Sequence, residues 1–109
     1  MKLMDSQHEV EELIRANTMT LIYFGGESCG VCRAVKPKLI ELLKNYPKIV
    51  SGSVDTEKSI ETAAAFSIFT IPVILVFIEG KEIIRAARHF SMRELEEKIA
   101  RYYSAVFEG

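Results

Sequence analysis

Two cysteines separated by two residues, in the segment Ser28–Cys32, constrain this chain more than any other feature. They are the only cysteines present, and they lie between the apolar run 21–24 and a long stretch with helical periodicity. If a helix begins near Cys29, the two sulfur atoms fall at positions i and i+3 on one helix face. Side chains at that spacing have Cα atoms about 5–6 Å apart, within the range that a disulfide tolerates. The pattern therefore predicts a reversible dithiol–disulfide pair.

The two cysteines are expected to differ in reactivity. Cys29 would lie at the helix N-terminus, where unpaired backbone N–H groups and the positive end of the helix favour a thiolate. Cys32, one turn further in, would be more buried and less reactive. Two other interpretations stay open: a chance pair of small core residues, or a metal shared between two chains. A zinc site within one chain is not expected, because His8 and His89 have no metal-type spacing.

Length and composition limit the classes of protein that fit. The 109 residues suffice for a single domain, 1–109, with a core that needs no covalent cross-link. Fourteen basic and fifteen acidic side chains give no support for a nucleic acid or an anionic membrane surface as partner. The longest apolar run, 71–78, is far shorter than the roughly 20 residues that span a bilayer. No secretory signal is visible at the N-terminus, so a cytoplasmic protein is expected, where a close cysteine pair is typical of catalysis or sensing.

The hydrophobic pattern predicts alternating strands and helices. Strands are expected near residue 3 and over 18–24, 49–55, 73–78 and 82–87, the first and last of them at sheet edges. Helices are expected from the capping box 6–9 to about 16, from the cysteines to about 46, over 57–66, and from the capping box 91–94 onward. The order βαβαβαββα predicts an α/β fold, a central mixed sheet of four to five strands flanked by four helices.

Apolar stripes indicate which helix faces pack on the sheet. The expected core positions are Val31, Val35, Leu39, Leu42 and Tyr46 in the second helix, Ile60, Ala63 and Ala64 in the third, and Met92, Leu95, Ile99, Tyr102 and Val106 in the last. Pro37 lies inside the second helix and predicts a kink there, because it cannot donate a backbone hydrogen bond.

Taken in order, these features resemble the thioredoxin family over nearly the whole chain. The matching residues are Phe24, Glu27, the Cys29-Gly30-x-Cys32 motif, Pro37, Asp55, Ile71-Pro72 and the Phe77-x-x-Gly80 turn. The resemblance implies a thioredoxin fold with Pro72 in the cis form beside the cysteine pair. It also implies that Cys29 attacks a substrate disulfide, that Cys32 resolves the mixed disulfide, and that Ile71 offers backbone groups to the substrate.

The function that this resemblance implies is that of a small thiol–disulfide oxidoreductase, an enzyme that reduces or exchanges protein disulfides. The substrates would be protein disulfides, and an external thiol reductase or reductant would regenerate the dithiol, because no flavin, nicotinamide or metal site is visible. No cofactor is expected beyond the redox-active disulfide Cys29–Cys32, and a monomer is expected.

The active-site loop departs from the family pattern at several positions. Ser28 replaces the tryptophan that typically precedes the first cysteine, and Val31 replaces the usual proline. Tyr23 stands at the position of the buried acid, and Ser51 at that of its lysine partner. Because that acid helps to deprotonate the resolving cysteine, its loss predicts slow turnover unless another group relays the proton.

Arg88 is a further departure, because a small glycine normally lies at this position, where substrate chains pass the disulfide. Arg88 and the adjacent His89 would either be solvated loop residues or place positive charge beside Cys29 and restrict which substrates dock. The departures at Ser28, Tyr23 and Arg88 support an alternative function, a redox-sensing or protein-binding module that kept the fold and lost general reductase activity.

Overall fold

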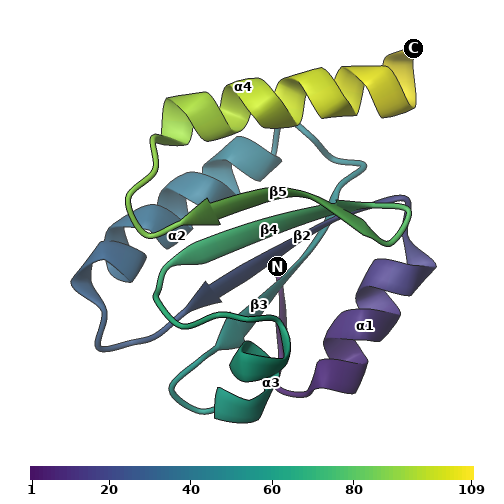
Figure 1. Cartoon of the computed structure of the whole chain (residues 1–109). Coiled ribbons are helices and arrows are strands. Elements are labelled where there is room, and N and C mark those ends of the chain that lie inside the picture. Colours follow the sequence, from purple (N-terminus) through teal and green to yellow (C-terminus); the bar gives the residue numbers. More distant parts are fainter.

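The computed structural model describes residues 1–109, and its centre is one mixed five-stranded sheet (Figure 1). The strands are β1 (Lys2–Met4), β2 (Met19–Gly25), β3 (Val50–Asp55), β4 (Val73–Ile78) and β5 (Lys81–Ala87). Their order is β1-β3-β2-β4-β5, in which β1, β3 and β2 are parallel and β4 and β5 are antiparallel to their neighbours. Both predicted edge strands, β1 and β5, lie at the sheet edges.

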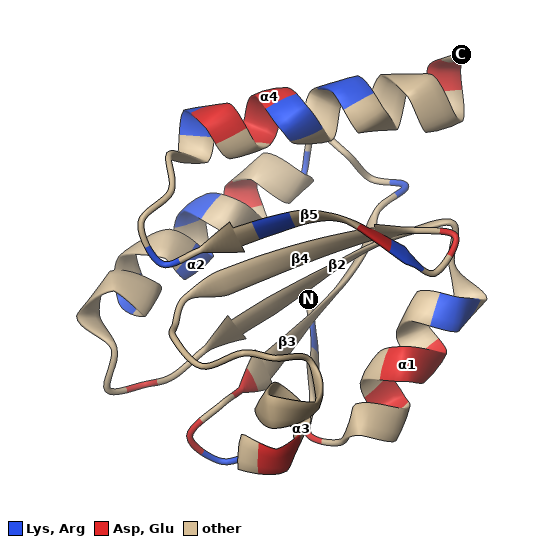
Figure 2. Cartoon of the chain, in the orientation of Figure 1, with Lys and Arg blue, Asp and Glu red and all other residues tan.

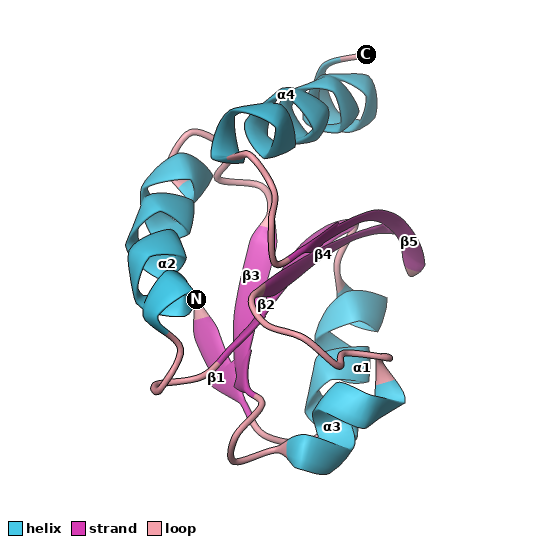
Figure 3. Cartoon of the chain, turned by 60° about the vertical axis from the view of Figure 1, so that its left-hand side comes forward, coloured by secondary structure: helices cyan, strands magenta, loops and turns pink.

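Four helices cover the sheet on its two faces, as predicted. They are α1 (Gln7–Ala16), α2 (Gly30–Leu43), α3 (Ile60–Ala65) and α4 (Met92–Tyr103), the last continued by a π-helical turn over Ser104–Glu108. Figure 3 shows α2 and α4 on one face and α1 and α3 on the other. The thioredoxin-type architecture expected from the sequence is therefore present. No helix combines the length and the apolar character that crossing a membrane requires.

The central strand β2 divides the core into two layers. All seven of its residues are buried, and alternate side chains enter opposite faces because strand side chains have a period of two. Leu21 and Tyr23 belong to the core beneath α2 and α4, whereas Ile22 and Phe24 belong to the core over α1 and α3. Strand β2 is thus held on both faces, and its C-terminal end delivers the chain to the cysteine pair.

Four of the expected core positions were wrong: Val31, Ile60, Ala64 and Tyr102 are exposed. Val31 is 50% exposed and Ile60 is 70% exposed, while Tyr102 faces solvent and Tyr103 is buried. In α2 the buried stripe begins at Cys32, one residue after Val31. In α4 the stripe continues at i+4 from Ile99, so that the ring of Tyr103 packs on the neighbouring core and its hydroxyl oxygen accepts a backbone hydrogen bond.

The third helix is shorter than expected, and its buried face differs. It begins at Ile60, because residues 56–59 form a turn whose backbone N–H groups at Lys58 and Ser59 donate to the carbonyl oxygen of Asp55. Thr62 and Ala63 are its buried residues. The second helix also ends earlier than predicted, at Leu43.

Candidate active site around Cys29 and Cys32

The two cysteines lie at the N-terminus of α2, immediately after the loop that follows β2. Cys29 is the N-cap residue, and its Sγ accepts a hydrogen bond from the backbone N–H of Cys32 at 3.2 Å. Cys29 is partly exposed, whereas Cys32 is only 3% exposed, and both are free thiols. The structure therefore presents the dithiol form, with an accessible sulfur in front and a buried sulfur one helical turn behind it.

The environment of Cys32 favours its protonated form. Burial raises the pKa of the Cys32 thiol, and its hydrogen bond with the Cys29 thiol raises it further. The hydroxyl of Tyr23 donates to the carbonyl oxygen of Cys32 at 3.3 Å. Burial also raises the pKa of Tyr23, so the phenol stays protonated at neutral pH. The neutral Tyr23 hydroxyl therefore occupies the position where the family typically has an acid. Ser53 pairs with Tyr23 on the neighbouring strand β3.

A cavity of about 790 Å³ opens beside Cys32 and joins it to the edge of the sheet at β1 and β3. Charged side chains make up much of its lining: Asp5, Glu27, Arg33, Lys36, Asp55 and Lys58. The ammonium group of Lys36 also lies 5.7 Å from the centre of the Tyr23 ring. Because the cavity is large and charged groups lie at its wall, water can reach the neighbourhood of the buried cysteine.

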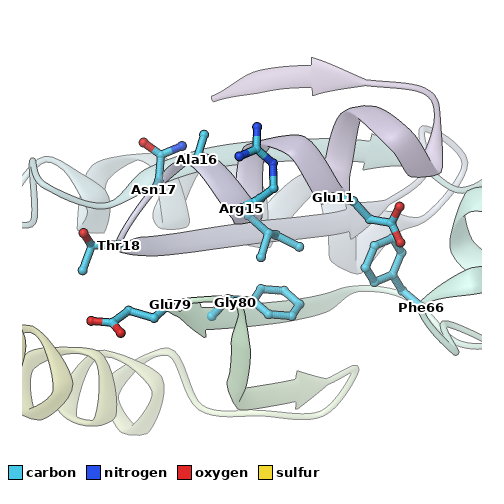
Figure 4. Close-up of a pocket in the computed structure, with 10 residues that line it drawn as sticks. Glu11, Arg15, Ala16, Asn17, Thr18, Phe66, Glu79 and Gly80 are labelled. Carbon is cyan, nitrogen blue, oxygen red and sulfur yellow. The ribbon is translucent and has the colours of Figure 1, made fainter.

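A second cavity, of about 760 Å³, lies at the opposite end of β2 and includes none of the residues predicted for the site. Figure 4 shows the side chains that surround it, which come from α1, the turn between α1 and β2, the residue after α3, and the turn between β4 and β5. Its distance from the cysteines along β2 excludes it from their chemistry.

The loop before β4 contains a cis peptide bond between Ile71 and Pro72, as the resemblance implied. Because Phe24 pairs with Val73, Pro72 lies at the end of β2 from which the cysteine loop departs. The backbone N–H of Arg88 donates to the carbonyl oxygen of Pro72 at 2.7 Å, and Arg88 has a φ of +46°. The structure therefore brings Ile71, Pro72 and Arg88 to one edge of the sheet, and Arg88 adopts a backbone conformation that favours glycine.

Gly30, Val31 and Ser28 are exposed on the loop and the first turn of α2. Ser28 has a partner that the sequence did not reveal, because its backbone N–H and its hydroxyl both donate to the carboxylate of Glu57. The expected helix start at Glu57 hid this role. The signal that could have found it is the parallel pairing of β2 and β3, which brings their C-terminal ends together.

Charge around the cysteines is mixed. Figure 2 shows basic residues on α2 and in the loop after β5, and an acidic residue in the loop before α2. Arg33, Lys36 and Arg88 supply positive charge, while Glu27 and Glu57 supply negative charge. The positive charge expected from the sequence is thus partly opposed by Glu57, which is hydrogen-bonded to the residue next to Cys29.

Comparison with known proteins supports the geometry. The family model described as Thioredoxin matches residues 2–101. The chain is similar to the thioredoxin-like protein YdfQ of Bacillus subtilis, with 38% identity over 112 residues, covering 100% of this chain and 99% of that protein. It is also similar to thioredoxin 1 of Plasmodium falciparum, with 29% identity over 101 residues, covering 91% of this chain and 97% of that protein.

Solved structures agree with the same assignment. The X-ray structure of Fasciola hepatica thioredoxin superposes with a TM-score of 0.85 and 29% identity, covering 93% of this chain and 98% of that one. The family match and the fold together support thiol–disulfide exchange as the general class of reaction. By sequence, by fold and by the placement of its cysteine pair, this chain belongs to the thioredoxin family.

Proposed function

We propose that the chain is a small thiol–disulfide oxidoreductase that reduces or exchanges protein disulfides through Cys29 and Cys32. The observation that carries the proposal is the arrangement of the pair: a partly exposed Cys29 sulfur at the helix N-terminus accepts the N–H of a buried Cys32. This arrangement gives one sulfur access to a substrate and keeps the other within reach of the first. Family membership supports the same class of reaction.

The proposed reaction has two exchange steps. The Cys29 thiolate attacks one sulfur of a substrate disulfide, which forms a mixed disulfide and releases the other substrate sulfur as a thiolate. Cys32 then loses its proton and attacks the Cys29 sulfur, which releases the second substrate thiolate and leaves the Cys29–Cys32 disulfide. The substrate gains two electrons, and the cysteine pair supplies them.

Deprotonation of Cys32 is the demanding part of the second step, because burial raises the pKa of this thiol. Tyr23 cannot act as the base at neutral pH, since its raised pKa keeps it protonated and its hydroxyl already donates to the Cys32 carbonyl oxygen. The charged cavity beside Cys32 offers a route to solvent. Water in this cavity, with Asp55 or Glu27 at its wall, is the proposed acceptor of the proton.

The substrate would dock over the edge formed by Ile71, Pro72 and Arg88, with the active-site residues Ser28, Gly30 and Val31 beside Cys29. An external thiol reductase or reductant would return the disulfide to the dithiol, and no metal or other cofactor takes part in the proposed cycle. A cytoplasmic monomer is the proposed setting. The alternative of a sensing or binding module is not favoured by the family match.

Two measurements test this function. Insulin disulfide reduction with dithiothreitol should be accelerated by the wild-type protein and not by Cys29→Ser. Brief treatment with limiting iodoacetamide at neutral pH should modify Cys29 in preference to Cys32, because Cys29 is the more exposed thiol. An inactive wild type, or preferential modification of Cys32, would contradict the proposed roles.

A further inference from the structure

The carboxylate of Glu57 is bound to the loop before Cys29, although Glu57 and Ser28 lie 29 positions apart in the sequence. The backbone N–H of Ser28 donates to Glu57 Oε1 at 3.4 Å, and Ser28 Oγ donates to Glu57 Oε2. A carboxylate that accepts from both groups restrains the backbone of Ser28 as well as its side chain. We propose that Glu57 is a positioning residue of the redox site, which holds the loop 25–28 in a conformation suited to disulfide formation.

The turn that carries Glu57 is itself fixed to the end of β2. Gly25 pairs with Asp55, and the backbone N–H of Thr56 donates to the carbonyl oxygen of Gly25 at 2.9 Å. The Asp55 carboxylate accepts the backbone N–H of Glu57 at 2.9 Å and that of Lys58 at 3.3 Å. The Glu57 backbone therefore has a defined position relative to the point where the cysteine loop begins.

Gly26 connects Glu57 to both cysteines. A Cβ atom at Gly26 would lie 2.8 Å from Cδ of Glu57, so the carboxylate packs directly on the glycine backbone. The carbonyl oxygen of Gly26 accepts the backbone N–H of Cys29 at 3.2 Å. A backbone hydrogen bond from Gly26 also lowers the pKa of Cys32, against the larger effect of burial. A shift of Glu57 would thus be felt at Gly26 and, through it, at the backbone of Cys29 and the thiol of Cys32.

This inference rests on the proposed function, and it concerns the equilibrium between dithiol and disulfide. In a glutathione buffer, one molecule of glutathione disulfide oxidises the protein dithiol, which gives the protein disulfide and two molecules of reduced glutathione. A restrained loop raises the effective concentration of one thiol at the other. Loosening the loop shifts the equilibrium toward the dithiol. The dithiol form gains conformational freedom, whereas the disulfide form stays constrained by its own bond. Removal of the Glu57 charge acts in the same direction, since a nearby negative charge disfavours a thiolate.

The experiment uses Ser28→Ala, Glu57→Ala and the double variant, with Glu61→Ala on α3 as the matched control. Each protein is equilibrated in glutathione buffers, and its reduced fraction is measured by thiol trapping. Glu57→Ala should lower the equilibrium constant for oxidation about threefold or more, and Ser28→Ala, which keeps the charge, should lower it by a smaller factor. In the Ser28→Ala background, the effect of Glu57→Ala on the equilibrium constant should shrink to about half or less. Both substitutions remove the same hydrogen bond, which joins the Ser28 hydroxyl to the Glu57 carboxylate. Glu61→Ala should match the wild type.

Several results would overturn the inference. A Ser28→Ala variant with the wild-type equilibrium constant would show that the Ser28 hydroxyl bond does not restrain the redox loop, and a Glu57→Gln variant shifted as far as Glu57→Ala would show that Glu57 acts through its charge alone. Unchanged constants in both variants would show that the hydrogen bonds do not influence the redox pair. If Glu57→Ala does not fold, Glu57→Met, which likewise carries no side-chain oxygen, takes its place and the same comparison decides. A wild type that forms no Cys29–Cys32 disulfide in any glutathione buffer would instead refute the proposed function.

Discussion

Replacement of Arg88 by glycine is expected to stabilise the fold. Arg88 has a φ of +46°, in the left-handed region where an L-residue costs about 1–2 kcal/mol. Its backbone N–H donates to the carbonyl oxygen of Pro72 at 2.7 Å, a bond that glycine keeps. Its exposed side chain enters none of the four salt bridges of the structure, so little is lost with it.

The net effect is the difference between two backbone terms. Glycine relieves the left-handed cost of about 1–2 kcal/mol but adds about 0.5–1 kcal/mol of unfolded-state freedom. The expected gain is therefore about 0.5–1 kcal/mol in the free energy of unfolding, or about 2–6 °C in Tm for a domain of this size. Urea denaturation of the reduced protein, with thermal unfolding beside it, measures both quantities.

Arg88→Ala is the matched control, because it removes the same charge and side chain but keeps the Cβ atom. It should be no more stable than the wild type and about 1 kcal/mol less stable than Arg88→Gly. An Arg88→Ala variant as stable as Arg88→Gly would refute the backbone argument. Loss of the charge should affect redox chemistry alike in both variants, lowering the reduction potential by about 10 mV if Arg88 supports a nearby thiolate.

Three further changes follow from the buried polar groups. Thr20→Val should raise the free energy of unfolding by about 1 kcal/mol, because the fully buried Thr20 hydroxyl has no hydrogen-bond partner. Tyr23→Phe should lower the free energy of unfolding by about 1 kcal/mol and slow release of the mixed disulfide, because the substitution removes the hydrogen bond to the Cys32 carbonyl oxygen. Burial raises the pKa of both Cys32 and Tyr23, so the dithiol form should lose stability as the pH rises above about 8.5, the pKa of an unfolded cysteine.

Denaturant titrations at fixed pH measure the first two changes, and a series from pH 7 to about 10.5 measures the third. A destabilised Thr20→Val would mean that the hydroxyl has a partner in solution. A Tyr23→Phe variant with unchanged stability and unchanged turnover would show that the hydrogen bond to Cys32 contributes nothing. In the pH series, Cys32→Ala should weaken the alkaline loss, and an identical slope in that variant would contradict the assignment to Cys32.

Much of the fold could be predicted from the sequence because its determinants are local. The helix starts predicted at residues 6–9 and 91–94 are confirmed, with Ser6 and Ser91 accepting the N–H groups of Glu9 and Glu94, although neither glutamate returns a bond to the backbone N–H of its serine. Apolar runs identified the strands, and the short spacing of the cysteines placed both on one helix end. The predictions failed where neighbouring candidates differ by one residue, as at Tyr102 and Tyr103, because packing against other elements decides which of them is buried.

The sequence by itself determined the pair that carries the chemistry and the order of elements around it, since helix periodicity and the Cys29–Cys32 spacing act over a few residues. Only the tertiary structure decided how the pair is held. The Glu57 carboxylate reaches Ser28 because β2 and β3 pair in parallel, and Arg88 reaches Pro72 because β4 and β5 pair in antiparallel register. Such contacts depend on strand register across the sheet, a long-range property that residue types along the chain do not reveal.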